Sequence, residues 1–297
     1  MFEEGASTII PEIVVSDWIL DARLLDSTTA LLITAHNSLH IYSLKTGTFD
    51  RRYNCVEQSL LYAAQLYLTD TSDIVVATGT VFNEIQLWHP LANPVSKTSE
   101  SPCMVPITSR LQGHDGCIFS LRFNDAGTLL ASCSDDRTIR VWDVEQGTYI
   151  AIGFAHIARV WDVRFLPQAS TPDDEIYLLS SSEDTSAILW TMSLEKRTLK
   201  VQEQYHAHGG KHVWSQAISY DGGMAATGGN DGGISIWDIG GWKERTGDMT
   251  HNYDIYWKEP SPRITINGRE KVDKIKGYRC LDHDNLLMTT GSGLNLN

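Results

Sequence analysis

Short runs of alternating apolar and polar residues, separated by turn residues, recur along this 297-residue chain. Three of the runs align without gaps: SCSDDRTIRVWDV (132–144), SSEDTSAILWTMS (181–193) and GGNDGGISIWDIG (228–240). Each contains an apolar stretch, a turn with Asp, and a second apolar stretch. Alternation with a period of two predicts short antiparallel strands joined by hairpins, because successive side chains of a strand point to opposite faces. The chain is therefore expected to be all-β.

The same runs define a sequence repeat. Their tryptophans, Trp142, Trp190 and Trp237, are 48 and 47 residues apart. Weaker copies end at Trp88 in IQLW and at Tyr42 in LHIY, and a Pro-rich insertion after Trp88 stretches that interval to 54 residues. The segment KGYRCLDHDNLLMTTGSG predicts two further strands without a closing Trp. Five repeats and a partial sixth are therefore expected.

The repeat resembles the WD-repeat β-propeller, in which units of about 40–45 residues each form one four-stranded blade. In that family a His near the start of a blade, a Ser or Thr, the turn Asp and the closing Trp share hydrogen bonds. The resemblance implies such a network in three blades, formed by His114, Asp136 and Trp142, by His156, Asp184 and Trp190, and by His208, Asp231 and Trp237. We expect one WD-repeat propeller domain over residues 1–297, incomplete here and forming the N-terminal part of a longer multi-propeller protein.

A second Trp-Asp pair, Trp161-Asp162, does not fit the end of a repeat. Measured from the His that precedes it, Trp161 matches Phe119 of the blade before, and Trp214 occupies nearly the same place in the blade after. This register predicts an aromatic series on consecutive first strands, serving either packing between blades or a partner site. Residues 161–164 also spell W-D-x-R, which resembles a pattern in substrate receptors of cullin-type ubiquitin ligases, but a place in a first strand makes that likeness accidental.

Charge is distributed unevenly along the chain. The formal net charge of −13 argues against nucleic-acid binding over most of the surface, since affinity for phosphate comes largely from Lys and Arg. Residues 242–279 nevertheless carry +3, which leaves −16 for the remainder. We predict an irregular basic and aromatic insertion at about 241–274, with candidate RNA or partner contacts at Tyr256, Trp257, Lys258, Arg263, Arg269, Lys271, Lys274 and Lys276. A solvated loop with a hairpin around Asn267-Gly268 is an equally good interpretation.

Motifs for catalysis and for cofactor binding are missing from the sequence. It contains no G-x-S-x-G, no G-x-x-x-x-G-K-[ST] and no H-E-x-x-H, and its five cysteines form no C-x-x-C pair. His206, His208 and His212 have a spacing that a metal could use, but His208 already belongs to a blade network. No apolar run approaches the roughly 18 residues of a membrane span. We expect no cofactor, no metal and no membrane contact, and a cytoplasmic location.

Three segments carry a more specific resemblance: GTVFNEIQLWHP (79–90), AHIARVWDVRFLP (155–167) and GKHVWSQAISYDGGMAATGGNDGGISIWDI (210–239). They resemble the WD-repeat regulatory subunit of the tRNA wobble-nucleotide 2′-O-ribose methyltransferase, and GTVFNE is distinctive because Phe82 replaces the turn Asp. The resemblance implies a non-catalytic scaffold that binds the catalytic methyltransferase subunit and helps to present tRNA. The other subunit would bind the methyl donor, so no small-molecule substrate is expected here. The alternative is a general protein-interaction adaptor, such as a ubiquitin-ligase substrate receptor or a trafficking scaffold.

Overall fold

A computed structural model describes residues 15–69, 73–91, 101–167, 175–206 and 208–240, together with the backbone of five strands between 255 and 290. Within these residues the regular structure is β-strand, except for one 3-10 turn, η2 (His208–Gly210). The chain divides into two compact units, one made of residues 1–80 and 86–110 and the other of 81–85 and 111–297. The predicted all-β class is confirmed.

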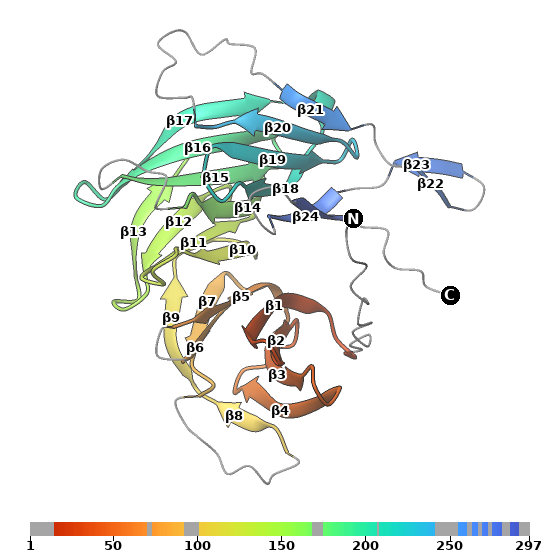
Figure 1. Cartoon of the computed structure of the whole chain (residues 1–297). Coiled ribbons are helices and arrows are strands. Elements are labelled where there is room, and N and C mark those ends of the chain that lie inside the picture. The colour runs from red at the N-terminus through yellow and green to blue at the C-terminus, as the bar shows by residue number, and fades with distance from the viewer. Residues whose placement is uncertain are drawn as a thin grey trace. The chain divides into compact units, whose positions relative to one another are not determined.

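The first two blades are formed by the strands that precede residue 113 (Figure 1). Blade 1 has the order β1-β2-β3-β4-β8, with β1 (Ile19–Asp26), β2 (Thr29–Thr34), β3 (Ser38–Ser43), β4 (Thr48–Cys55) and β8 (Cys103–Val105). Blade 2 has the order β5-β6-β7-β9, with β5 (Leu61–Leu68), β6 (Ile74–Thr80), β7 (Glu84–Trp88) and β9 (Ile107–Gln112). The Pro-rich insertion thus supplies an extra strand, β8, which pairs parallel to β4.

Three further sheets follow in sequence order (Figure 1). Blade 3 contains β10 (Ile118–Phe123), β11 (Leu129–Ser134), β12 (Ile139–Asp143) and β13 (Thr148–Gly153). Blade 4 contains β14 (Val160–Phe165), β15 (Ile176–Ser182), β16 (Ser186–Ser193) and β17 (Thr198–His206). Blade 5 contains β18 (Val213–Ile218), β19 (Met224–Gly229), β20 (Ile234–Asp238) and β21 (Ile255–Glu259). The five predicted blades are therefore confirmed.

The register of the blades follows the sequence prediction. Trp142, Trp190 and Trp237 lie on the third strands β12, β16 and β20, whereas Trp161 and Trp214 lie on the first strands β14 and β18. Each third strand begins after a tight turn whose last residue has a positive φ, as the hairpin geometry demands: 69° at residue 137, 78° at residue 185 and 72° at residue 232. Only the turn of blade 5 places Gly there, where no Cβ opposes the left-handed conformation.

Apolar side chains are buried between consecutive blades. One cluster joins blades 3 and 4, where Ile139 and Val141 pack with Val160 and Trp190. This packing leaves no room beside Gly153, since a Cβ there would lie 2.7 Å from Ile139 and 2.9 Å from the Trp190 ring. A second cluster joins blades 4 and 5 around Leu189 and Trp237, and a third joins blades 1 and 2 around Trp88.

The segment at 241–274, expected to be irregular, contains three strands. Besides β21, which completes blade 5, β22 (Arg263–Ile266) and β23 (Arg269–Val272) form an antiparallel hairpin. Its β-branched and aromatic residues favour strands, and the edge of β20 supplies backbone partners for β21. The two strands predicted for a sixth blade are present as β24 (Ile275–Cys280) and β25 (Leu286–Thr290), with β24 beside β18. A single propeller domain over 1–297 stays a prediction.

Candidate interaction surface and its structural networks

Blade 3 contains a buried hydrogen-bonded network of four side chains, two from strands β11 and β12, one from the loop before β10 and one from the turn between β11 and β12. The Trp142 indole Nε1–H donates to Ser132 Oγ at 2.8 Å, and Ser132 Oγ lies 2.7 Å from His114 Nε2. His114 Nδ1 lies 2.8 Å from Asp136 Oδ2. Because a hydroxyl has one proton, Ser132 donates to Nε2 while it accepts from Trp142, which leaves Nδ1–H to donate to the carboxylate. With a neutral His114 and an ionised Asp136, every polar atom of this four-residue network therefore has a hydrogen-bond partner.

The pKa shifts agree with this proton arrangement. Burial lowers the pKa of His114 and outweighs the opposing effect of Asp136. Burial alone would raise the pKa of the Asp136 carboxyl, but hydrogen bonds from His114, the Asp115 amide and Thr138 hold it well below its ordinary value. Both shifts stabilise the folded network at neutral pH.

Blades 4 and 5 repeat the network. In blade 4 the Ser180 hydroxyl lies 2.7 Å from His156 Nε2 and accepts the Trp190 indole N–H at 2.7 Å, and His156 Nδ1 lies 2.8 Å from Asp184. In blade 5 the corresponding residues are Thr227, His208, Trp237 and Asp231, with distances of 2.8 to 3.0 Å. The structure therefore brings together all nine residues that the propeller resemblance assigned to networks.

These networks have the connectivity of a Ser-His-Asp triad, but their geometry does not suit hydrolysis. A catalytic serine must reach a substrate carbonyl, with its His free to accept the proton. Ser132 is fully buried, the His114 side chain has no exposed surface, and the serine oxygen already accepts the Trp142 N–H. The same limits apply to Ser180 in blade 4. The networks hold each blade's entry loop against its hairpin turn.

Acidification is expected to lower the free energy of unfolding from near pH 7 downward. The folded-state pKa of His114 lies below its ordinary value, so the unfolded chain binds this proton first, and stability present above about pH 6.5 is lost as the pH falls. Asp136 and Asp184 act in the same direction below about pH 4, since their folded-state pKa values are lowered. Thermal melting between pH 7.5 and about pH 3 covers the ordinary pKa values of His and Asp and measures this loss of stability.

The control for this titration is His114→Gln, which should show a shallower slope between pH 7 and 5. A residual slope remains, because burial and Arg52 also lower the pKa of His40. Equal slopes in both proteins would contradict a neutral buried His114.

Blade 2 has a different network, which the sequence analysis did not identify. Phe82 occupies the turn and is 73% exposed, and the Trp88 indole N–H donates instead to Asn37 Oδ1 of blade 1 at 3.1 Å. The Asn37 amide donates to Gln86 Oε1 at 3.1 Å, and the Gln86 amide donates to Glu57 Oε2 at 3.0 Å. An amide network between two blades therefore replaces the network inside one blade.

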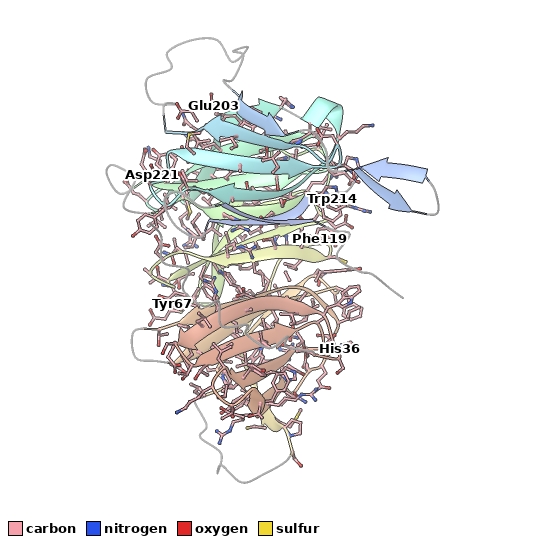
Figure 2. All side chains as sticks on the ribbon, turned by 45° about the vertical axis from the view of Figure 1, so that its right-hand side comes forward. His36, Tyr67, Phe119, Glu203, Trp214 and Asp221 are labelled. Carbon is pink, nitrogen blue, oxygen red and sulfur yellow. The ribbon has the colours of Figure 1, made fainter. Side chains whose placement is uncertain are left out.

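The predicted aromatic series is present on the first strands of blades 3, 4 and 5. The Phe119 and Trp161 ring centroids are 4.6 Å apart, and those of Trp161 and Trp214 are 4.3 Å apart, with tilted planes. All three side chains are partly exposed. Figure 2 places Phe119 and Trp214 at the edge of these sheets opposite Asp221. We call the edge that carries the loops of His114, His156 and His208 the His-turn edge.

The W-D-x-R sequence lies on β14, within a first strand, as its register predicted. Asp162 is buried, and its carboxylate accepts hydrogen bonds from the Ser120 hydroxyl at 2.7 Å and from Arg164 Nε at 3.2 Å. Arg122 lies 3.6 Å away. Asp162 and Arg164 are thus engaged inside the propeller, unlike the end of a third strand that the ligase-receptor pattern requires.

Side chains of the basic segment lie outside the described residues, so the candidate contacts Tyr256, Trp257, Lys258, Arg263, Arg269, Lys271, Lys274 and Lys276 stay predictions. The backbone pairs Arg263 with Val272 and Ile264 with Lys271, as expected for the hairpin interpretation. Among the described residues no cluster of three or more His, Cys, Asp or Glu could hold a metal ion. Both ring nitrogens of His208 are engaged in the blade 5 network. No helix in the described part of the chain is long and apolar enough to span a bilayer.

Comparison with known proteins identifies the repeats and a set of relatives. The WD domain, G-beta repeat family matches residues 105–143 and 199–238. The chain is 33% identical over 233 residues to the tRNA (34-2′-O)-methyltransferase regulator WDR6 of Bos taurus, covering 76% of this chain and 19% of that protein. The regulator of the same name from Homo sapiens is 30% identical over the same shares, and that from Drosophila melanogaster is 26% identical over 69% of this chain and 22% of that protein.

A different WD-repeat protein also matches. The WD and tetratricopeptide repeats protein 1 of Homo sapiens is 32% identical over 190 residues, which cover 63% of this chain and 24% of that protein. The matched part of the chain spans only about a fifth of the length of the regulators.

Proposed function

This chain is homologous to the WD-repeat regulators of tRNA (34-2′-O)-methyltransferase, and on that premise we propose that it is a non-catalytic scaffold for such an enzyme. It binds the catalytic subunit and supports ribose methylation of the tRNA wobble nucleotide. The observation that carries the proposal is the similarity to these regulators over 76% of the chain. Since only about a fifth of each relative is matched, this function is proposed for the region that the chain represents.

The site geometry supports a scaffold rather than an enzyme. In blades 3 and 4 the Ser and His side chains are held in buried networks, and each serine hydroxyl accepts a hydrogen bond from a tryptophan. We infer that the catalytic subunit binds the methyl donor, and that the complex acts in the cytoplasm. Rigid blades with exposed loops suit partner binding, because loops on a fixed scaffold can present side chains without much ordering cost.

Reconstitution with a purified tRNA (34-2′-O)-methyltransferase tests the proposal. The chain alone should transfer no methyl group to tRNA. Added to the catalytic subunit, it should raise the rate of wobble 2′-O-methylation, measured by mass spectrometry of the digested tRNA, and the two proteins should co-elute on gel filtration. A catalytic subunit that neither binds the chain nor responds to it would contradict the proposal and favour the general adaptor.

The candidate RNA contacts of the basic segment predict that tRNA binding depends on its charge. Reversing Lys271, Lys274 and Lys276 to Glu should weaken tRNA binding, because the remainder of the chain carries −16 and repels phosphate. Each Lys that contacts a phosphate should contribute about one unit to the slope of log affinity against log salt. Fluorescence anisotropy with labelled tRNA at several salt concentrations measures both quantities.

The matched control for this charge reversal is Lys196, Lys200 and Lys211 to Glu, an equal charge change at exposed positions outside the segment. Equal losses of tRNA affinity in the two triple variants would show a general charge effect. Unchanged affinity in the first variant would leave the segment a solvated loop and hairpin.

A further inference from the structure

The loop between β13 and β14 presents two unusually exposed apolar side chains. Phe154 is 74% exposed and Ile157 is 79% exposed. Single apolar residues are common on protein surfaces, but this pair lies three positions apart in one short loop. Between them lies His156, whose side chain is buried in the blade 4 network. The loop therefore lies at the His-turn edge.

Hydrogen bonds fix the backbone of this loop at both sides of Ile157. The Ile157 amide donates to Asp184 Oδ2 at 3.1 Å, and the same carboxylate oxygen bonds to His156. Further along, the carbonyl oxygen of Arg159 accepts from the Glu183 amide at 2.8 Å. A loop fixed in this way exposes apolar groups that lose little conformational entropy on binding.

The neighbouring blades show that the network does not require apolar residues at these two positions. Blade 3 has Gln112 and Asp115 at the places that Phe154 and Ile157 occupy relative to the network His. Blade 5 has His206 and Gly209, which are also exposed. Two exposed apolar side chains do not stabilise the folded state, because apolar surface stabilises a fold only when it is removed from water. The apolar pair therefore points to a function in binding.

Charges around the loop favour a protein over a nucleic acid as the occupant. Arg159 bridges the carboxylates of Asp135, at 2.5 Å, and Glu183, at 3.8 Å, and Asp115 is exposed on the loop of blade 3. The Arg159 guanidinium is therefore paired with two carboxylates. Phosphates would be repelled there, whereas lysines and arginines around an apolar pocket would be attracted. Apolar anchors with a charged rim are the usual composition of a protein interface.

We propose that Phe154 and Ile157 are the anchors by which this chain docks the catalytic methyltransferase subunit, in an apolar pocket bordered by basic residues. This inference rests on the proposed function and assigns the surface that performs it. The carboxylates of Asp115, Asp135 and Glu183 orient the partner, and Phe154 and Ile157 supply most of the affinity.

The test uses the full chain and the purified catalytic subunit, with affinity measured by biolayer interferometry. Phe154→Gln and Ile157→Asp give blade 4 the residues of blade 3, and both sites are exposed, so the melting temperature should stay unchanged. Each single change should raise Kd by about tenfold and the pair by about a hundredfold. The control is Tyr220→Gln, which removes a 69% exposed ring beside Asp221, at the opposite edge in Figure 2. It should leave Kd unchanged.

The outcomes separate this inference from the proposed function. If the wild-type chain does not bind the catalytic subunit, the proposed function is wrong and the docking surface falls with it. If wild type binds and the double variant binds equally well, the docking surface is wrong while the function stands. A double variant that loses affinity for tRNA but keeps its affinity for the enzyme also overturns the inference, and makes the loop an RNA contact.

Discussion

Replacing Asp136 with Ala is expected to lower the free energy of unfolding by about 2 to 3 kcal/mol. The carboxylate accepts hydrogen bonds from His114 Nδ1 at 2.8 Å, from the Asp115 amide at 2.9 Å, and from the amide and hydroxyl of Thr138 at 2.9 and 2.7 Å. The His114 side chain has no exposed surface, so water cannot replace its lost acceptor. A buried unsatisfied donor costs about 1 to 3 kcal/mol, and the solvent-accessible Asp115 amide costs less.

Urea unfolding followed by tryptophan fluorescence measures this effect. Asp115→Ala is the matched control, since that side chain is exposed and only its backbone amide takes part in the network. Asp136→Asn should fall between Ala and wild type, because its amide oxygen can still accept from His114. A midpoint for Asp136→Ala equal to that of Asp115→Ala would show that the network adds no stability.

Local spacing in the sequence was enough to predict the blades and their register. In each network the Ser or Thr lies ten residues before the closing Trp, and the His lies within 30 residues of the Asp that it contacts. This short-range pattern is visible in the sequences of blades 3, 4 and 5. The third-strand tryptophans and the first-strand aromatic series followed directly from it.

Contacts between residues far apart in the chain could not be predicted in the same way. Trp88 finds its acceptor, Asn37, 51 residues away in the preceding blade, and no repeat pattern marks an Asn for that role. The strand at 255–259 was missed because a long insertion separates it from the third strand β20, with which it pairs. The exposure of Phe154 and Ile157 depends on how the loop folds back on Asp184, which hydrophobicity alone predicts wrongly.

Replacing Asp162 with Ala is expected to lower the free energy of unfolding by about 2 to 4 kcal/mol. This carboxylate is 8% exposed and links two blades, since it accepts from Ser120 of blade 3 and Arg164 of blade 4 and lies near Arg122. Burial alone would raise its pKa, but Arg164, Arg122 and Ser120 hold that pKa below its ordinary value. Removing a charged partner from a buried cluster usually costs about 3 to 5 kcal/mol. The expected loss is smaller here because the side chains of both arginines are at least a quarter exposed, so water can solvate them after the change.

Two further variants identify why Asp162→Ala loses stability. Asp162→Asn keeps the volume and the acceptor for Ser120 but removes the charge, so it should lose about half as much as Ala. Asp50→Ala, at an exposed position, is the control and should stay within about 0.5 kcal/mol of wild type.

The sign of the pH dependence follows from the lowered pKa: stability from Asp162 is present above about pH 4 and is lost as the pH falls through the folded-state value. The difference between wild type and Asp162→Asn in urea should therefore shrink on acidification, and a difference that stays constant between pH 7 and 3 would show that packing, and not charge, joins blades 3 and 4 at this point.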